Sequence, residues 1–73
     1  MSVIGIYEHA HFIPKKFRWR DRVYLIQEIT LVSDIRDGLI KKRMYSVLCN
    51  KTLYRLLFNR ETEDWKLEEV WVE

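Results

Sequence analysis

Apolar and polar residues alternate with a period of two along most of the chain, which is the side-chain spacing of a β-strand. The segments that might otherwise form a helix are dense in Val, Ile, Tyr, Trp and Thr, residues that favour strands. The alternation predicts strands at residues 3–8, 15–20, 22–31, 42–49, 52–59 and 64–72. Because short polar segments join them, we predict a mainly β fold, an antiparallel meander of five or six strands.

Turn-forming residues gather between the predicted strands. These connections lie at residues 20–22, 33–38, 50–51 and 60–64. The pair Asp37-Gly38 is the clearest turn signal, because Asp-Gly favours the tight turn of a β-hairpin. A short helix near the amino terminus or within residues 33–41 is the alternative for those segments.

Several predicted strands are apolar on both faces. In residues 42–49, for example, Tyr45 and Val47 alternate with Met44 and Leu48. A flat sheet with one face in water does not need a second apolar face. We therefore expect the sheet to curve into a partly open, SH3-like barrel. Coverage of the second face by a terminal segment, or by another copy of the chain, is the alternative.

Composition favours a single small β domain spanning residues 1–73. Hydrophobic residues make up 48% of the chain and aromatic residues 14%, enough for a core without disulfides or a metal. One cysteine allows no internal disulfide, which fits a reducing cytoplasm. The first residues lack the features of a signal peptide, and no apolar stretch approaches the roughly 20 residues of a membrane span. We expect a cytoplasmic protein without membrane contact.

The net charge of +2 is unevenly distributed along the chain. Residues 1–43 contain nine Lys and Arg against five Asp and Glu, and the densest basic group is interleaved with aromatic rings. The candidate nucleic-acid-binding residues are Lys15, Lys16, Arg18, Arg20 and Arg22, with residues 41–43 as a further basic group. Cations combined with stacking rings are typical of nucleic-acid binding. In a strand, however, Lys16, Arg18 and Arg20 face away from the rings, so a solvated face that protects a sheet edge, or one that binds an acidic protein, is the alternative.

The sequence contains no convincing catalytic or metal site. His9 and His11 would share one side of a strand, but structural zinc usually takes four ligands. Cys49 and His9 would form a nucleophile–base pair only if the fold placed them together. The acidic residues between 61 and 73 alternate with cations, which indicates cross-strand charge pairs rather than catalytic carboxylates. We therefore predict no enzyme, no metal and no cofactor.

The last predicted strand carries two tryptophans. Trp65 and Leu67 are expected to share a face with Trp71, and Val70 to lie on the opposite face. Trp71 is the candidate protein-binding residue, because tryptophan is a frequent anchor of protein interfaces. The leading hypothesis is a non-catalytic module that binds an unknown protein partner or forms a homodimer. Nucleic-acid binding through residues 15–22 is the alternative.

The order of motifs also resembles a known family. The pattern F-x-W-R-x-R-x-Y occupies residues 17–24, Y-x-L occupies residues 54–56, and W-x-L-x-x-V-W occupies residues 65–71. This series is similar to that of a family of short bacterial β domains without established activity, some of which occur beside Y-family polymerase-like proteins. The resemblance covers residues 12–72 and implies no functional residue. The polymerase association slightly favours nucleic-acid binding.

Overall fold

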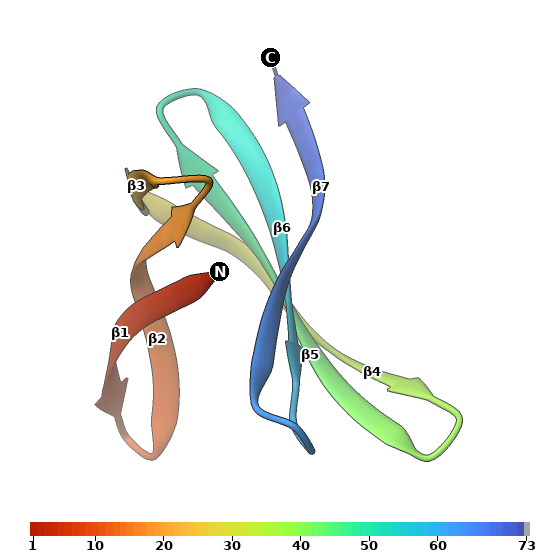
Figure 1. Cartoon of the computed structure of the whole chain (residues 1–73). Coiled ribbons are helices and arrows are strands. Elements are labelled where there is room, and N and C mark those ends of the chain that lie inside the picture. The colour runs from red at the N-terminus through yellow and green to blue at the C-terminus, as the bar shows by residue number, and fades with distance from the viewer. Residues whose placement is uncertain (73) are drawn as a thin grey trace.

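The computed structural model describes residues 1–72, which form strands joined by short turns (Figure 1). The seven strands are β1 (Ser2–Glu8), β2 (His11–Trp19), β3 (Arg22–Leu25), β4 (Glu28–Asp37), β5 (Ile40–Cys49), β6 (Thr52–Asn59) and β7 (Asp64–Val72). The mainly β fold is confirmed, whereas the count of five or six strands is wrong. No helix forms in residues 1–72, so the short helix considered near the amino terminus or within residues 33–41 is absent. This part of the chain likewise contains no helix that could cross a membrane.

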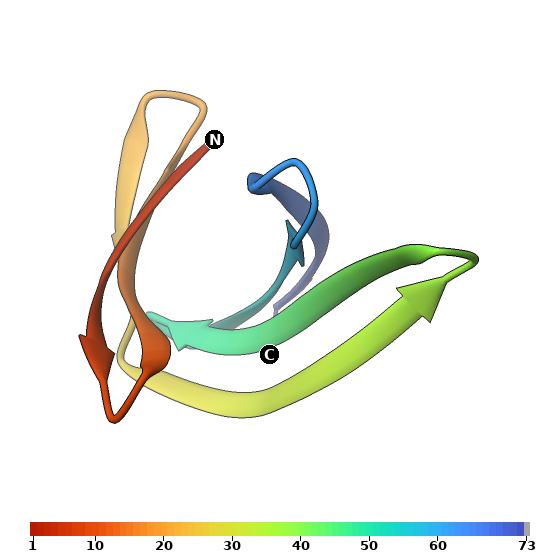
Figure 2. The ribbon, with the colours of Figure 1, turned by 90° about the horizontal axis from the view of Figure 1, so that it is seen from below.

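The strands form two antiparallel sheets in which neighbours in sequence are neighbours in space. β1, β2 and β3 make a three-stranded sheet, and β4, β5, β6 and β7 make a four-stranded sheet. This order is the predicted meander. Within the described strands, β1 and β7 are edges that do not pair with each other, so no closed barrel forms. In Figure 2 the three-stranded sheet stands opposite β6 and β7, with β5 curving between them.

The predicted strand at residues 22–31 divides where the chain passes from one sheet to the other. The backbone amide of Ile26 donates to the Lys15 carbonyl oxygen at 2.9 Å, in the three-stranded sheet. The next amide, of Gln27, donates to the Leu48 carbonyl oxygen at 2.9 Å, in the four-stranded sheet. One segment therefore supplies β3 to one sheet and β4 to the other. Periodicity does not reveal this crossing, because both halves are extended.

β4 continues through residues 33–37, which the sequence predicts as a turn. Asp34 lies opposite Arg43 of β5, and the Arg43 Nε donates to Asp34 Oδ1 at 2.8 Å. This cross-strand pair offsets the low strand preference of aspartate. The turn itself comprises Gly38 and Leu39, with Gly38 at φ 63°. Glycine at the first of two turn residues is typical of a type II′ hairpin.

The other two-residue hairpin turns place residues other than glycine in the left-handed conformation. They are formed by His9 and Ala10, by Arg20 and Asp21, and by Asn50 and Lys51, with φ between 50° and 66°. Positive φ at both positions is characteristic of the type I′ turn, whose twist matches that of the flanking strands. For residues other than glycine and asparagine, this conformation costs roughly 1–2 kcal/mol.

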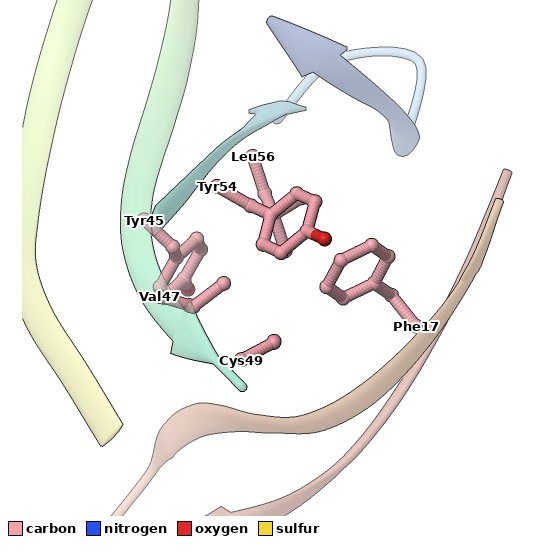
Figure 3. Packing of buried hydrophobic residues seen from close by; sticks show 6 residues of the cluster. All are labelled: Phe17, Tyr45, Val47, Cys49, Tyr54 and Leu56. Carbon is pink, nitrogen blue, oxygen red and sulfur yellow. The ribbon is translucent and has the colours of Figure 1, made fainter. Parts of the chain in front are cut away.

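The core lies between the two sheets and is small (Figure 3). Its buried cluster consists of Phe17, Tyr45, Val47, Cys49, Tyr54 and Leu56. Phe17, from β2, points at Tyr54 of β6, with ring centroids 5.3 Å apart, and stacks on Tyr24 of β3 at 4.9 Å. The alternation correctly predicts that Phe17 points inward. Of the six residues in this cluster, Phe17 is the one from the three-stranded sheet, so the attachment between sheets depends heavily on it.

Candidate binding surfaces

A cleft of about 320 Å³ lies between the two sheets. The β1–β2 hairpin provides one wall, and β5, β6, β7 and the loop between β6 and β7 provide the other. Its lining consists of Val3, Tyr7, Ala10, Phe12, Arg43, Tyr45, Phe58, Arg60 and Trp65. Five of these side chains are aromatic and two are arginines, so the cleft combines flat apolar surfaces with positive charge. Its volume is at the lower end of the range for small-ligand sites.

Trp65 is the centre of the aromatic cluster in this cleft. The centroid of its ring lies 4.7 Å from that of Phe58, 5.4 Å from that of Tyr45 and 5.9 Å from that of Phe12. Tyr7 approaches Phe12 edge-on at 5.3 Å and is 79% exposed. Four rings therefore pack against one another between the sheets, while most of the Tyr7 ring is open to solvent.

The two arginines of the cleft are held in different ways. Arg43 donates from Nε to Asp34, and this hydrogen bond raises the pKa of Arg43 and lowers the pKa of Asp34, so both groups stay charged at neutral pH. Arg60 has no ion-pair partner among the described residues. Its backbone amide donates to the Lys41 carbonyl oxygen at 2.9 Å, which fixes the loop beside β5. Of the two, Arg60 is the guanidinium available to an anion.

A second cavity, of about 260 Å³, adjoins the cleft and is strongly basic. It is lined by Asp34, Ile35, Arg36, Lys41, Lys42 and Arg60, and Arg60 also lines the cleft. Lys42 pairs with Asp37 at 3.6 Å. Arg36 and Lys41 face each other across β4 and β5, with no ion-pair partner within residues 1–72. Taken together, the linings of the two cavities contain five cations and a single carboxylate, that of Asp34.

Trp71 and Leu67 lie on opposite faces of β7, so the predicted shared face is wrong. The pairing of β6 with β7 shifts register between Arg55 and Leu56. Leu67 lies opposite the buried Leu56, whereas Trp71 lies opposite Leu53, on the outer face of the sheet. A bulge inserts one extra residue, and that residue reverses the alternation for the rest of the strand. The two-residue period alone cannot show the reversal.

The outer face of the four-stranded sheet carries an apolar patch. The strand register places Leu31, Met44, Leu48, Leu53, Leu57 and Trp71 on it, and these six residues are called the outer patch below. Leu31 is 50% exposed and Trp71 39% exposed, while Met44 is buried by its neighbours. The Arg55 guanidinium lies 4.6 Å from the centroid of the Trp71 ring and 3.6 Å from the Glu69 carboxylate. The register places Ser46, Arg55 and Glu69 in a row across the middle of the outer patch, with Met44 and Leu57 on one side of this row and Leu48, Leu53 and Trp71 on the other.

The predicted basic residues of β2 do not form a single basic surface. Lys16 and Arg18 alternate with the buried Phe17 and lie on the outer face of the three-stranded sheet. Arg18 is 3.5 Å from the carboxylate of Asp21, which offsets part of its charge. Lys15 falls at the register shift between β1 and β2, where it has no cross-strand partner in β1.

The remaining two predicted cations point elsewhere. Arg20 lies in the turn after β2 rather than on the strand, and its guanidinium lies 4.5 Å from the centroid of the Trp19 ring. Arg22 lies opposite Trp19 in the β2–β3 pair, and Trp19 packs against the core, so Arg22 belongs to the inner side of the sheet. The expectation that Arg20 shares a strand face with Lys16 and Arg18 is therefore wrong.

His9 and Cys49, considered as a nucleophile–base pair, lie on different elements. His9 lies in the β1–β2 turn, and Cys49 ends β5, where it lines a different cavity beside β3. Burial raises the pKa of the Cys49 thiol to about 11, so it is a neutral thiol at physiological pH. Within the described part of the chain, no group of three His, Cys, Asp or Glu side chains is placed to hold a metal ion.

The sequence analysis did not single out Tyr7 or Arg60, the most exposed ring of the cleft and its arginine without an ion-pair partner among the described residues. Neither belongs to a motif, and both reach the cleft through the packing of distant strands. Lys41 and Arg43, by contrast, follow the same alternation as the buried Tyr45, a signal that places them on the inner face. Comparison with family models, with curated proteins and with solved structures found no match to this chain. The resemblance to short bacterial β domains stays a prediction.

Proposed function

We propose that this chain is a non-catalytic, cytoplasmic module that forms a homodimer through the outer patch of its four-stranded sheet. The observation that carries the proposal is the apolar surface left in contact with water. Leu31 and Trp71 are both substantially exposed, and they lie on a face that no other element of residues 1–72 covers.

The exposed area of the chain exceeds that of a compact monomer by about the area of one standard interface. The single chain exposes 5531 Å². A compact monomer of 9.0 kDa would expose about 4,850 Å². The excess, roughly 700 Å², is close to the roughly 800 Å² that each partner buries in a standard interface. The radius of gyration, 11.9 Å, is likewise larger than the about 11.2 Å of a compact domain with 73 residues.

A second copy is the partner whose chemistry the outer patch fits. A two-fold dimer brings identical patches together, so each patch must be complementary to itself. Apolar residues on both sides of a central Arg55–Glu69 pair meet this requirement, because apolar residues then face apolar residues and the cation of each copy faces the anion of the other. The neutral, buried Cys49 thiol, which lies beside β3 and not at the β1–β2 turn that holds His9, favours binding over catalysis.

Sedimentation velocity over a range of protein concentrations tests the proposal. We expect a species of twice 9.0 kDa that dissociates on dilution. The variant Leu31→Asp should weaken dimerisation at least tenfold, because it introduces a charge into the outer patch. Val23→Asp is the matched control, since Val23 is 59% exposed but lies on the other sheet. Circular dichroism would establish that both variants stay folded.

Two results would contradict the homodimer. A wild-type chain that stays monomeric at every concentration would exclude self-association. Equal effects of Leu31→Asp and Val23→Asp would show that the outer patch is not the contact surface. A heterologous protein captured on the patch by a monomeric chain would replace the second copy as the partner.

A further inference from the structure

We propose that the cleft between the sheets binds a base of a single-stranded nucleic acid, and that the adjoining basic cavity binds the phosphates next to that base. This site is separate from the outer patch and from residues 15–22. It assigns a ligand to the concave side of the molecule, where the proposed dimer contact leaves the cleft open.

The aromatic side chains supply the first part of the argument. Single-stranded nucleic acids bind proteins by stacking their bases on exposed rings, because every base has a flat π face. Tyr7 offers such a ring, because it contacts Phe12 edge-on at 5.3 Å and is 79% exposed. Trp65 and Phe58, on the opposite wall, keep the cleft apolar. A flat apolar group therefore fits between the Tyr7 ring and the opposite wall.

The arginines supply the second part of the argument. Arg60 lines both the cleft and the basic cavity and has no carboxylate partner among the described residues. A guanidinium in this position can donate to a phosphate attached to a nucleotide whose base lies in the cleft. Arg43 is already bonded to Asp34 through Nε, which holds it in the wall and limits the repulsion that Asp34 would exert on a phosphate.

The second cavity indicates a ligand with several anionic groups. Arg36 and Lys41 continue the positive charge away from the rings, along the β4–β5 hairpin that projects to the side in Figure 2. A ligand with one anionic group would leave these two cations unpaired. Aromatic rings joined by a chain of regularly spaced phosphates are the chemistry of a single nucleic-acid strand.

Fluorescence anisotropy of a labelled oligothymidylate, titrated with the full chain at low ionic strength, tests the inference. We expect salt-sensitive association, and weaker binding of an abasic oligomer of the same length and charge. Arg60→Ala should weaken binding at least fivefold and reduce the salt slope by about 0.7, the contribution of one phosphate contact to a single strand. Arg18→Ala removes the same charge from the outer face of the other sheet and should change neither quantity.

A second pair of variants separates stacking from charge. Tyr7→Ala should weaken binding of the oligothymidylate at least fivefold and leave binding of the abasic oligomer unchanged. Leu39→Ala is the control, because Leu39 is 93% exposed at the tip of the β4–β5 hairpin, outside the cleft lining. Leu31→Asp should bind the oligomer as the wild type does, so failure of the dimer and failure of this site can be told apart.

Several results would overturn the inference. No association at low ionic strength would exclude it, and so would equal losses for Arg60→Ala and Arg18→Ala. An abasic oligomer that binds as tightly as oligothymidylate would refute the stacking site in the cleft. Thymidine monophosphate that binds as tightly as the oligomer would refute the role given to the basic cavity.

Discussion

Replacing Phe17 with alanine tests whether the two sheets depend on each other. Phe17 is 1% exposed and is the contribution of the three-stranded sheet to the buried cluster. Truncation of a buried phenylalanine costs about 3–5 kcal/mol, which includes the cavity left behind. The lost ring contacts with Tyr24 and Tyr54, at 4.9 and 5.3 Å, are part of this cost.

The importance of this loss depends on the total free energy of unfolding of the domain. A domain of 73 residues is typically stable by roughly 4–11 kcal/mol. The expected loss for Phe17→Ala, about 4 kcal/mol, is therefore a third or more of the whole. The backbone hydrogen bonds of Ile26 and Gln27 each lie within one sheet, so packing of Phe17 and its neighbours against the four-stranded sheet holds the two sheets together.

Urea unfolding followed by far-ultraviolet circular dichroism measures the effect. Val23→Ala is the control, because Val23 lies in the neighbouring strand of the same sheet but is exposed on its outer face. We expect a change within about 0.5 kcal/mol for Val23→Ala. A loss below about 1 kcal/mol for Phe17→Ala, or similar losses for both variants, would refute the conclusion that Phe17 joins the sheets.

Four further predictions concern single side chains. Lys51→Gly should raise the melting temperature, with a gain of about 1 kcal/mol, because glycine adopts φ 66° without strain; a lower melting temperature would contradict this. Gly5→Ala should lower the urea midpoint by an amount equivalent to about 1–3 kcal/mol, because its Cβ would collide with backbone atoms of β2. Burial raises the pKa of Cys49 from 9.0 to about 11, so stability should fall as the pH rises from about 9 to 11, and less so in Cys49→Ala. Its thiol should also react with a thiol reagent near neutral pH only after unfolding. The hydrogen bond from Arg43 lowers the pKa of Asp34 below 3.8, so its stabilisation is present at neutral pH and lost as the pH falls through that lowered value. Asp34→Asn should therefore be less stable than the wild type at neutral pH and equally stable in strong acid, as measured by urea unfolding.

The sequence alone determined the local features of this protein. The bounds of β6 and β7 agree with the alternation at residues 52–59 and 64–72, and Phe17 points inward as its position in the pattern predicts. The two-residue turn after β5 also follows from sequence, because Asn50 tolerates a left-handed backbone. These features depend on side chains a few residues apart, which a linear pattern records directly.

The tertiary structure alone decided how the strands are combined. Two features depend on the partner strand: the division of the chain at Ile26 and Gln27, and the reversal that places Trp71 on the outer face. Both depend on it because register is set between strands and not within one. The cleft brings Tyr7 of β1 near Trp65 of β7, side chains from opposite ends of the chain. No alternation within a single strand encodes that approach, since it results from the packing of two curved sheets around Phe17.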